Sequence, residues 1–311
     1  MDSPLISARM PDAPLVPGVH PRTPFDEYRA AAGVNHSLLR TIMHDAARQG
    51  AGTLADARDY LDSDDDDSTR EMRFGSAYHA SLDPDGPDVI IGPEYNRRSS
   101  TERATFAAFR AEHEAAGEVV VEYDEGPTLL AMLEAMHEQR TTRAALEARG
   151  EAEVACAWRM PEPVIEDVFA QADEPEPLTL DCKARVDKVV KGTTLIDWKT
   201  TNRVRDPRGW GFARWFADRG YASAAAWYVD GWQAATGRLF GMVYVIQERE
   251  EPYRAVVLSV SDDWLAFGRS QYREAFAALC GAIRTGEWPA WPDSVLVPEP
   301  TPAMLARRGI M

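Results

Sequence analysis

The chain has 311 residues, a hydrophobic content of 45% and a formal net charge of −16 at pH 7. It contains no apolar run of about 18 residues and no apolar segment behind a basic start, so we expect neither a membrane span nor a signal peptide, and we expect the cytoplasm as its location. The three cysteines are odd in number and widely spaced, which argues against a disulfide framework, a CxxC zinc site and a four-thiolate iron–sulfur cluster.

The charge is unevenly distributed along the chain. Residues 183–219 contain ten Lys or Arg and four Asp, a local balance of +6, so the rest of the chain carries −22. The net charge argues against a nucleic-acid partner, whereas a basic band within an acidic body is the pattern that a DNA groove in an otherwise repelling surface would give. Charge alone leaves open the alternative that these side chains only solvate one face of the fold.

The first half of the chain is predicted to be helical. Residues 1–24 contain six prolines and little periodic hydrophobicity, which indicates a flexible or surface-draped lead-in. Asn35 is a candidate N-cap for the first helix. Four consecutive aspartates within 63–69 are typical of a solvated loop, with an acidic metal cluster as the alternative. Apolar side chains at helical spacing predict four helices, over 37–49, 74–82, 101–116 and 128–149.

The second half alternates between strands and helices. Residues 183–201 form two predicted strands joined by a tight turn at Lys191 and Gly192. The residues over 160–177 and those after Pro289 are proline-rich and predict loops. Further strands are predicted over 153–159, 240–247 and 255–260, and further helices over 206–218, 223–236 and 262–285.

This order implies an α/β fold, in which a small mixed central sheet is flanked by helices and preceded by extra helices. We expect a single domain over residues 25–290, with the catalytic core at about 125–260. The proline-rich residues 291–311 would form a tail.

Charged side chains on the two central strands suggest the chemistry. Side chains at i and i+2 of a strand share a face, so Asp197 and Lys199 project together, and Asp187 lies on the partner strand. Two carboxylates near one Mg²⁺, with a lysine that orients or activates water, suit the cleavage of a phosphodiester. Glu153 and His79 could add ligands. The ordinary alternatives are a surface ion pair, a capping glutamate and a histidine satisfied in a helix interface.

These residues belong to short motifs that follow one another along most of the chain. Through them, the chain resembles the phage and prophage exonucleases of the RecE (exonuclease VIII) type, within the PD-(D/E)xK nuclease superfamily. The motifs are Tyr28 with Gly33-Val-Asn-His-Ser37-Leu-Leu, Gly75-Ser-Ala-Tyr-His79-Ala-Ser-Leu-Asp-Pro84, Pro93-Glu-Tyr-Asn-Arg97-Arg98, Ala152-Glu153 with Trp158, Cys182-Lys-Ala-Arg185-Val-Asp187, Ile196-Asp197-Trp-Lys199-Thr-Thr201, Tyr221 with Ala226-Trp-Tyr228-Val-Asp-Gly231, and Glu287-Trp-Pro289.

The resemblance implies a restriction-endonuclease-like core with an N-terminal helical extension, and a catalytic Mg²⁺ for which Mn²⁺ can substitute. Lys199 would be the motif lysine. The family's glutamine between two tyrosines of the following helix is replaced by Ala224. This departure indicates either a branch that dispenses with the amide or a weakened or deliberately substituted form. The metal ligands would be Asp187, Asp197, Glu153, His79 and the backbone carbonyl of Trp198.

The resemblance also implies resection of linear double-stranded DNA from its ends in the 5′-to-3′ direction, in a bacterial host cell and with a phage-encoded origin as one option. The remaining 3′ strand would serve a RecT-type single-strand annealing protein. A ring-shaped homo-oligomer, such as a tetramer, would place basic surfaces along a central channel. The alternatives are an endonuclease, a single-strand nuclease, a catalytically weakened DNA-binding or assembly protein, and an acidic partner-binding protein.

Basic and aromatic side chains supply the candidate DNA contacts. Trp210 and Trp215 could stack on bases, although their spacing beside apolar residues favours a place in the core or in a subunit interface. The candidate DNA-binding residues are Arg97, Arg98, Lys183, Arg185, Arg203, Arg205, Arg208, Arg214, Arg219, Tyr221 and Tyr228.

Overall fold

The computed structural model describes residues 13–43, 52–62, 69–163 and 176–291. Several predicted segments fall wholly or partly outside the described residues. They are the start of the lead-in, the end of the first predicted helix, the aspartate run, most of the loop over 160–177, and the tail from residue 292. No helix among the described residues is long and apolar enough to cross a membrane.

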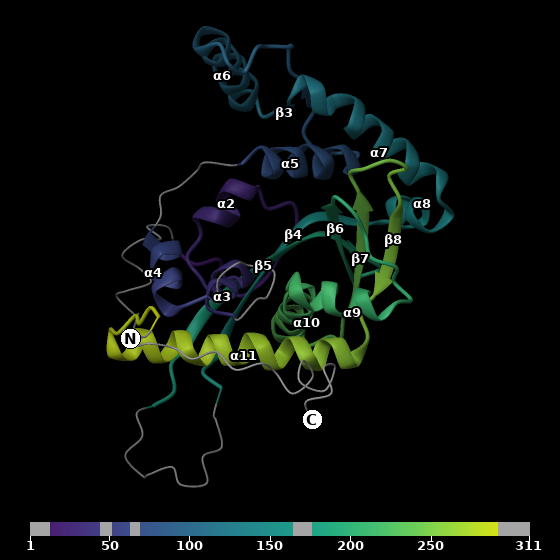
Figure 1. Ribbon diagram of the computed structural model, residues 1–311. Coiled ribbons are helices and arrows are strands. Elements are labelled where there is room, and N and C mark those ends of the chain that lie inside the picture. The colour runs from purple at the N-terminus through teal and green to yellow at the C-terminus, as the bar shows by residue number, and fades with distance from the viewer. Residues whose placement is uncertain (1–12, 44–51, 63–68, 164–175, 292–311) are drawn as a thin grey trace, which may run out of the picture.

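A six-stranded mixed sheet forms the centre of the fold, in the order β1-β4-β5-β6-β7-β8 (Figure 1). The pair β6 and β7 is parallel, and all other neighbours in this sheet are antiparallel. This arrangement confirms the predicted mixed sheet. The strands are β1 (Gly18–His20), β4 (Gly150–Pro161), β5 (Thr179–Val190), β6 (Thr194–Thr201), β7 (Gly241–Glu248) and β8 (Ala255–Ser259).

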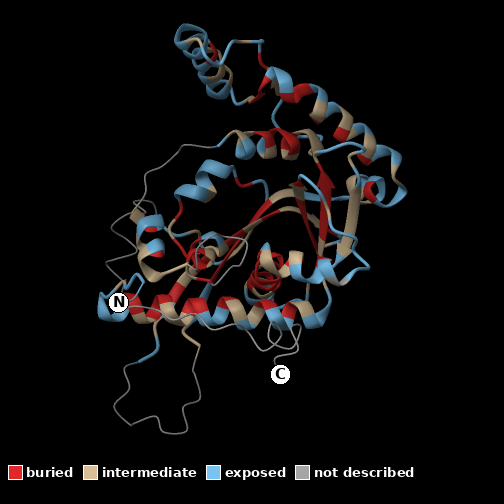
Figure 2. Ribbon diagram, in the orientation of Figure 1, coloured by how far each residue is buried: buried red, intermediate tan, exposed pale blue. Residues whose placement is uncertain are grey.

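Helices cover both faces of the sheet, and the residues that they turn toward it are buried (Figure 2). The flanked mixed sheet confirms the predicted α/β fold class. On one face lie α3 (His36–Ile42), α4 (Leu54–Asp62), α9 (Trp210–Asp218), α10 (Tyr221–Thr236) and α11 (Asp262–Thr285). On the other face lie α5 (Arg70–Leu82), α7 (Gly126–Glu138) and α8 (Arg140–Glu147).

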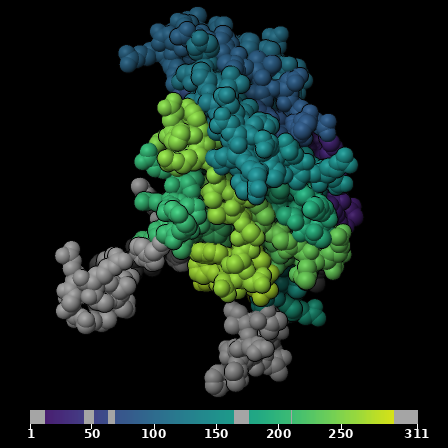
Figure 3. All heavy atoms as spheres, turned by 90° about the vertical axis from the view of Figure 1, so that its right-hand side faces the viewer, coloured from purple at the N-terminus to yellow at the C-terminus, as the bar shows by residue number. Residues whose placement is uncertain are grey.

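The elements that precede β4 include a second, smaller sheet, in which β2 and β3 pair in parallel. Figure 3 shows the blue and teal atoms of this part of the chain above the green and yellow atoms of the later strands and helices. The remaining elements of this region are α2 (Phe25–Ala30), β2 (Val89–Ile91), α6 (Ser100–Ala115), β3 (Val119–Val121) and the 3₁₀ helix η1 (Tyr123–Glu125).

The tight turn between β5 and β6 lies where the sequence predicts it. Lys191 has φ 52° and Gly192 has φ 64°, so both central residues are left-handed, as a type I′ turn requires. The N–H of Thr193 donates to the carbonyl of Val190 at 3.2 Å and closes the turn. The register of the two strands places Val190 opposite Thr194, so Thr193 belongs to the loop together with the two turn residues.

Beyond this turn, β5 and β6 soon separate. Their ladder stops after the pair Lys188–Ile196, although both strands continue. The freed edge of β5 pairs instead with the segment at Val34, whose N–H and C=O each form a 2.8 Å hydrogen bond to the backbone of β5. The sheet thus opens into a fork. In the register of the ladder, Asp187 and Asp197 are the first residues inside it.

The side chains of β5 also change faces at the fork. Val186 packs in the core beside α10 and α11, whereas Val190 packs in the core on the opposite face. Strict alternation would keep both valines on one face, so the strand changes phase between them. On β4, the register places Glu153 opposite Asp187, and its φ of 52° interrupts the ladder there. Irregularities of this kind re-aim side chains beside functional sites.

The helix predicted over 128–149 is two helices, α7 and α8. Gln139 between them is extended, with φ −80° and ψ 128°. The buried hydroxyl of Thr142 donates to the carbonyls of Met136 at 2.6 Å and Gln139 at 3.0 Å, which stabilises the break. The sequence has no glycine or proline near Gln139 to indicate a break, so a prediction from helical periodicity alone gives one continuous helix.

Candidate active site at the sheet fork

Both carboxylate oxygens of Asp187 are held in fixed positions at the fork. His79, which projects from α5, places Nδ1 3.0 Å from Asp187 Oδ1. The backbone N–H of Trp198 on β6 donates to Asp187 Oδ2 at 2.6 Å. The Trp198 ring is buried in the core on the α5 face. The contact from Asp187 therefore bridges the two strands where the backbone ladder ends.

Asp197 and Lys199 form an ion pair on the next strand. Asp197 is only 3% exposed, whereas about a third of the Lys199 side chain is exposed. This arrangement confirms that the two side chains share a face of β6. The charges of Asp197 and Lys199 both act on the hydroxyl of Tyr228, which projects from α10. The site therefore lies between α5 on one side of the sheet and α10 on the other.

Glu153 reaches the same region from β4. Its carboxylate forms an ion pair with Arg185, which neighbours it across the β4–β5 ladder. Arg185 is anchored in turn, because its Nε donates to the carbonyl of Thr23 at 3.3 Å and its guanidinium lies over the ring of Phe25. The structure thus brings the five predicted charged residues around one fork, each carboxylate with its own cationic partner.

The three carboxylates have different proton affinities. Burial would raise the pKa of Asp187, but the charge and hydrogen bond of His79 and the charge of Lys199 outweigh it and lower the pKa to about 2. Burial, helped by the charge of Asp187, raises the pKa of Asp197 to about 6 against the opposing charge of Lys199. Burial likewise raises the pKa of Glu153 to about 7, although Arg185 opposes the shift. Of the three carboxylates, Asp187 has the lowest pKa and is therefore the most fully ionised near neutral pH.

The pKa values of the cationic partners His79 and Lys199 are raised. Burial disfavours the charged forms of His79 and Lys199. The charge of Asp187 outweighs burial at His79 and raises its pKa. Asp197 and Asp187 together raise the pKa of Lys199 well above its ordinary value, so this lysine is an ammonium ion at neutral pH.

The carboxylates at the fork are suitable ligands for a hard divalent cation, but they do not form a complete metal-ligand set among the residues that the structure describes. Carboxylate oxygens are the ligands that Mg²⁺ prefers. Asp197 Oδ2 and Glu153 Oε2 are buried and, within the described residues, lack a hydrogen bond of ordinary geometry. Within those same residues, no three His, Cys, Asp or Glu side chains are grouped as a metal ligand set. These carboxylates fit such an ion chemically. A bound cation would compete with Lys199 for Asp197 and with Arg185 for Glu153.

The prediction that Lys183 contacts DNA is wrong, because this side chain is buried. It is 1% exposed, and its Nζ donates to the backbone carbonyls of Tyr28 at 2.7 Å, Arg29 at 3.1 Å and Ala31. These carbonyls lie at the C-terminal end of α2, where a cation is favoured by the helix dipole. Lys183 therefore ties α2 to β5 and does not face a phosphate backbone.

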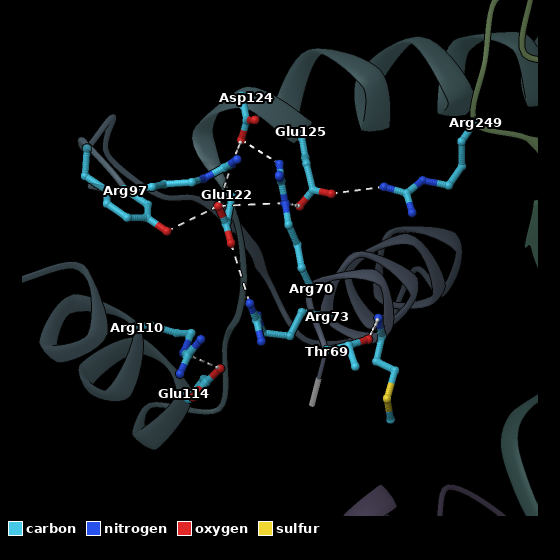
Figure 4. A network of polar contacts seen from close by, with 12 residues as sticks. Thr69, Arg70, Arg73, Arg97, Arg110, Glu114, Glu122, Asp124, Glu125 and Arg249 are labelled. Carbon is cyan, nitrogen blue, oxygen red and sulfur yellow. Dashed lines mark hydrogen bonds and ion pairs between the residues drawn. The ribbon is translucent and has the colours of Figure 1, made fainter. Parts of the chain in front are cut away.

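Arg97 belongs to a network of arginines and carboxylates (Figure 4). Its guanidinium bonds to Glu122 and Asp124, each at 2.7 Å, and Arg70 shares the same two carboxylates. The neighbouring Arg98 is exposed. A role of either arginine in DNA binding stays a prediction, and for Arg97 it would require competition with these carboxylates.

Arg185 is half-buried, whereas the other arginines of the basic band are exposed, as a phosphate contact requires; these are Arg203, Arg205, Arg208, Arg214 and Arg219. Three of them have acidic partners, in the ion pairs Arg203–Glu250, Arg208–Asp206 and Arg214–Asp218. Within the described residues, no carboxylate partner is found for Arg205 or Arg219. Their contacts with DNA stay predictions.

The aromatic candidates are mostly packed. Tyr221 is 8% exposed, Tyr228 is half-buried, and Trp215 is half-buried against Phe212 and Tyr221. This favours the core alternative for Trp215 over base stacking. The side chain of Trp210 lies outside the described residues.

Sequence reasoning missed a hydrogen-bonded pair, His36 and Ser223, whose histidine is within reach of the charge of Lys199. His36 Nε2 lies 2.9 Å from Ser223 Oγ and links α3 to α10, and the charge of Lys199 acts on it. The Ser223 hydroxyl donates to the carbonyl of Gly220, so it accepts from His36. His36 lies within the Gly33–Ser37 motif, and this membership could have predicted that it lies near the site.

The comparisons with known proteins agree with this geometry. Residues 174–294 match the family model of a PDDEXK-like domain of unknown function (DUF3799), and this segment contains Asp187, Asp197 and Lys199. No curated protein is similar enough in sequence to count as a relative.

Among solved structures, a "putative exonuclease" from Eubacterium rectale is similar in fold, with a TM-score of 0.54 and 11% sequence identity over 88% of this chain and 92% of that chain. The structure of SSO0001 has a TM-score of 0.24 and 9% identity over 66% of this chain and 85% of that one, which is too low to support any argument. Residues 174–294 are therefore similar to a PDDEXK-like domain, and the fold is similar to that of the E. rectale protein.

Proposed function

We propose that this protein is a Mg²⁺-dependent DNA exonuclease that degrades linear double-stranded DNA from its ends. The observation that carries the proposal is the meeting of Asp187, Asp197 and Lys199 at the sheet fork, within the segment that matches a PDDEXK-like domain. The fold likeness to a putative exonuclease supports a nuclease. The cytoplasm of a bacterial host cell is the proposed location.

Asp187, Asp197 and Glu153 would hold the ion, with His79 and the carbonyl of Trp198 as further proposed ligands. A bound Mg²⁺, or Mn²⁺ in its place, supplies neutralisation of phosphate charge and a lowered pKa for an attacking water. His79 and the Trp198 N–H fix the Asp187 carboxylate from both sides. Lys199 holds a permanent positive charge beside Asp197, where negative charge develops on the cleaved phosphate.

The test is digestion of end-labelled linear duplex DNA, with and without Mg²⁺, by Asp187→Asn and Asp197→Asn variants. Each substitution keeps the side-chain shape and removes the anion, so we expect the cleavage rate to fall about 100- to 1,000-fold or more while DNA binding survives. Asp181→Asn is the matched control, since Asp181 lies on the same strand and is 44% exposed. Cleavage by Asp187→Asn or Asp197→Asn at the wild-type rate would show that the site assignment is wrong.

The finer features rest on the resemblance and need their own measurements. Resection in the 5′-to-3′ direction predicts that label at a 5′ end is released before label at the opposite 3′ end. Closed circular DNA should resist digestion, and its degradation would indicate an endonuclease instead. A ring-shaped homo-oligomer, such as a tetramer, predicts a solution mass of several chains, so a fully active monomer would exclude the ring. A RecT-type annealing protein is the proposed partner for the 3′ strand.

A second candidate, a weakened nuclease that binds or assembles on DNA, is favoured by Ala224. This residue is 8% exposed on α10, three residues after Tyr221 and four before Tyr228, so the three share one helix face. The charges of Lys199 and Asp197 reach the hydroxyls of both tyrosines, so that face is turned toward the site. If the missing amide limits activity, Ala224→Gln should raise the cleavage rate. An unchanged or lower rate would remove this reason for the second candidate.

A further inference from the structure

A buried glutamine on β7 ties together three segments that are far apart in the sequence. Gln247 is 0% exposed, and its Oε1 accepts a 2.7 Å hydrogen bond from the Tyr78 hydroxyl on α5. Its Nε2 donates to the carbonyl of Met132 on α7 at 2.8 Å and to that of Tyr253, between β7 and β8, at 3.1 Å. Both polar groups of the amide therefore have partners.

Gln247 is an amide at the end of a strand whose preceding residues are hydrophobic. A buried amide costs free energy unless its groups are hydrogen-bonded, whereas an apolar side chain carries no such cost. A buried polar side chain with all its partners in place fixes one arrangement of the segments around it. The amide therefore indicates that the position of α5 against β7 is specified by hydrogen bonds as well as by packing.

Phe74 and Tyr78 present one face of α5 to the end of β7. They are four residues apart, so they lie one above the other on the helix, and both are fully buried. Gln247 holds Tyr78, and the guanidinium carbon of Arg249 lies 4.0 Å from the centroid of the Phe74 ring. Arg249 is itself held by Glu125, to which it donates at 3.0 Å (Figure 4). Two successive turns of α5 are thus fixed against the end of one strand.

His79 follows Tyr78 directly on the same turn of α5, and the centroids of the two rings are 6.1 Å apart. His79 Nδ1 lies 3.0 Å from Asp187 Oδ1, and because an ionised carboxylate only accepts, this nitrogen is the donor. Since both side chains leave one hydrogen-bonded turn of helix, a rotation of α5 that breaks the Tyr78 bond also moves His79 away from Asp187. The bond to Gln247 therefore sets the position of the His79 ring.

We propose that Gln247 is a positioning residue, which acts through Tyr78 to hold His79 against Asp187. Gln247 lies within the segment that matches the PDDEXK-like domain, whereas both α5 residues precede that segment. The contact therefore makes the early helices part of the site. The inference rests on the proposed function, because His79 and Asp187 are proposed there as ligands of the metal ion.

The first test observes the contact between His79 and Asp187 in the metal-free protein. With isotope-labelled histidines and EDTA present, NMR detects an imidazole N–H that a carboxylate protects from exchange, and His79→Ala identifies the signal of His79. Tyr78→Phe keeps the ring and removes only the hydroxyl, so this signal should broaden or disappear. Tyr272→Phe is the matched control, since it also removes a buried hydroxyl bond, 2.6 Å to Asp230 Oδ2 between α10 and α11, and should keep the signal.

The second test measures Mn²⁺ binding by calorimetry. Tyr78→Phe should weaken binding about 10-fold, as is typical when a group that orients a metal ligand is lost, whereas Tyr272→Phe should leave it unchanged. Both substitutions should lower the melting temperature by a few degrees, so a difference in affinity separates positioning from lost stability. In a His79→Ala background, which has already lost the ring, Tyr78→Phe should weaken binding no further. Gln247→Met should weaken binding as Tyr78→Phe does, and Tyr78→Phe keeps the test decisive if Gln247→Met does not fold.

Retention of the His79 signal in Tyr78→Phe, or equal Mn²⁺ affinity of Tyr78→Phe and a metal-binding wild type, would overturn the inference. A further loss of affinity in the His79→Ala background would also overturn it, because Tyr78 would then act by another route. DNA cleavage, measured separately, decides the proposed function. A wild type that cleaves DNA while Tyr78→Phe keeps the signal retains the proposed function and loses the positioning role. A wild type that neither binds Mn²⁺ nor cleaves DNA, but loses the His79 signal in Tyr78→Phe, keeps the positioning role and rejects the nuclease.

Discussion

Replacement of Lys183 by Met tests whether this lysine holds the fold or contacts DNA. Its Nζ makes three hydrogen bonds to backbone carbonyls around the end of α2. At about 2 kcal/mol for each bond to a charged donor, they contribute about 6 kcal/mol. Burial lowers the pKa of Lys183 from 10.5 to about 8, which corresponds to a cost of about 3 kcal/mol for the buried charge. We therefore expect Lys183→Met to lower the free energy of unfolding by about 3 kcal/mol.

Urea denaturation at pH 7 measures this loss, and Lys188→Met is the matched control. Lys188 lies on the same strand and donates to the carbonyls of Leu146 at 2.7 Å and Ala145 at 3.5 Å, near the end of α8. Its side chain is only half-buried, so water can replace these bonds, and we expect a loss of about 1 kcal/mol.

The pH dependence gives a second readout for Lys183. Its folded pKa of about 8 lies below the unfolded value of 10.5, so the unfolded chain binds more protons between these values. Wild-type stability should therefore rise through this group as pH increases from 8 to 10.5, and Lys183→Met should lack that rise.

The salt dependence of duplex DNA binding distinguishes a structural role of Lys183 from the predicted DNA contact. A lysine that neutralises a phosphate contributes about one to the slope of log K against log salt. If Lys183→Met lowered that slope by one and left the urea midpoint unchanged, the structural role would be refuted.

Two further predictions concern the Gly33–Ser37 motif. Burial lowers the pKa of His36 to about 3, below its unfolded value of 6.5, so stability should fall by about 2 kcal/mol between pH 6 and pH 4 as the unfolded chain takes up the proton. His36→Gln should flatten this fall in urea titrations, and an unchanged profile would contradict the assignment. Gly33 has φ 137°, and an added Cβ would lie 3.3 Å from the Asp181 carbonyl oxygen, so Gly33→Ala should cost about 2 kcal/mol. Gly281→Ala, which meets open space in α11, should cost nothing, and equal losses in the two variants would contradict the strain argument.

The α/β fold class and most of the long elements could be predicted from the sequence, because local patterns decide them. The strands of residues 183–201, the left-handed turn at Lys191 and Gly192, and the shared face of Asp197 and Lys199 all follow from geometry within a few residues. The long helix after Ser261 is likewise found where predicted, over Asp262–Thr285. Short elements such as β1 were missed because each depends on a distant partner: Val19 pairs with Cys156.

The candidate site could be predicted as a set of residues but not as an arrangement. Asp187 and Asp197 were expected across an intact hairpin, yet the strands separate at that point, because Val34 rather than β6 takes the freed edge of β5. Lys183 belongs to the same charge pattern as the surface arginines, and only the packing of α2 against β5 buries it. The sequence by itself determined which charged groups stand on the central strands. Only the tertiary structure decided which of them face the fork, because contacts between segments far apart in the chain set burial and pairing.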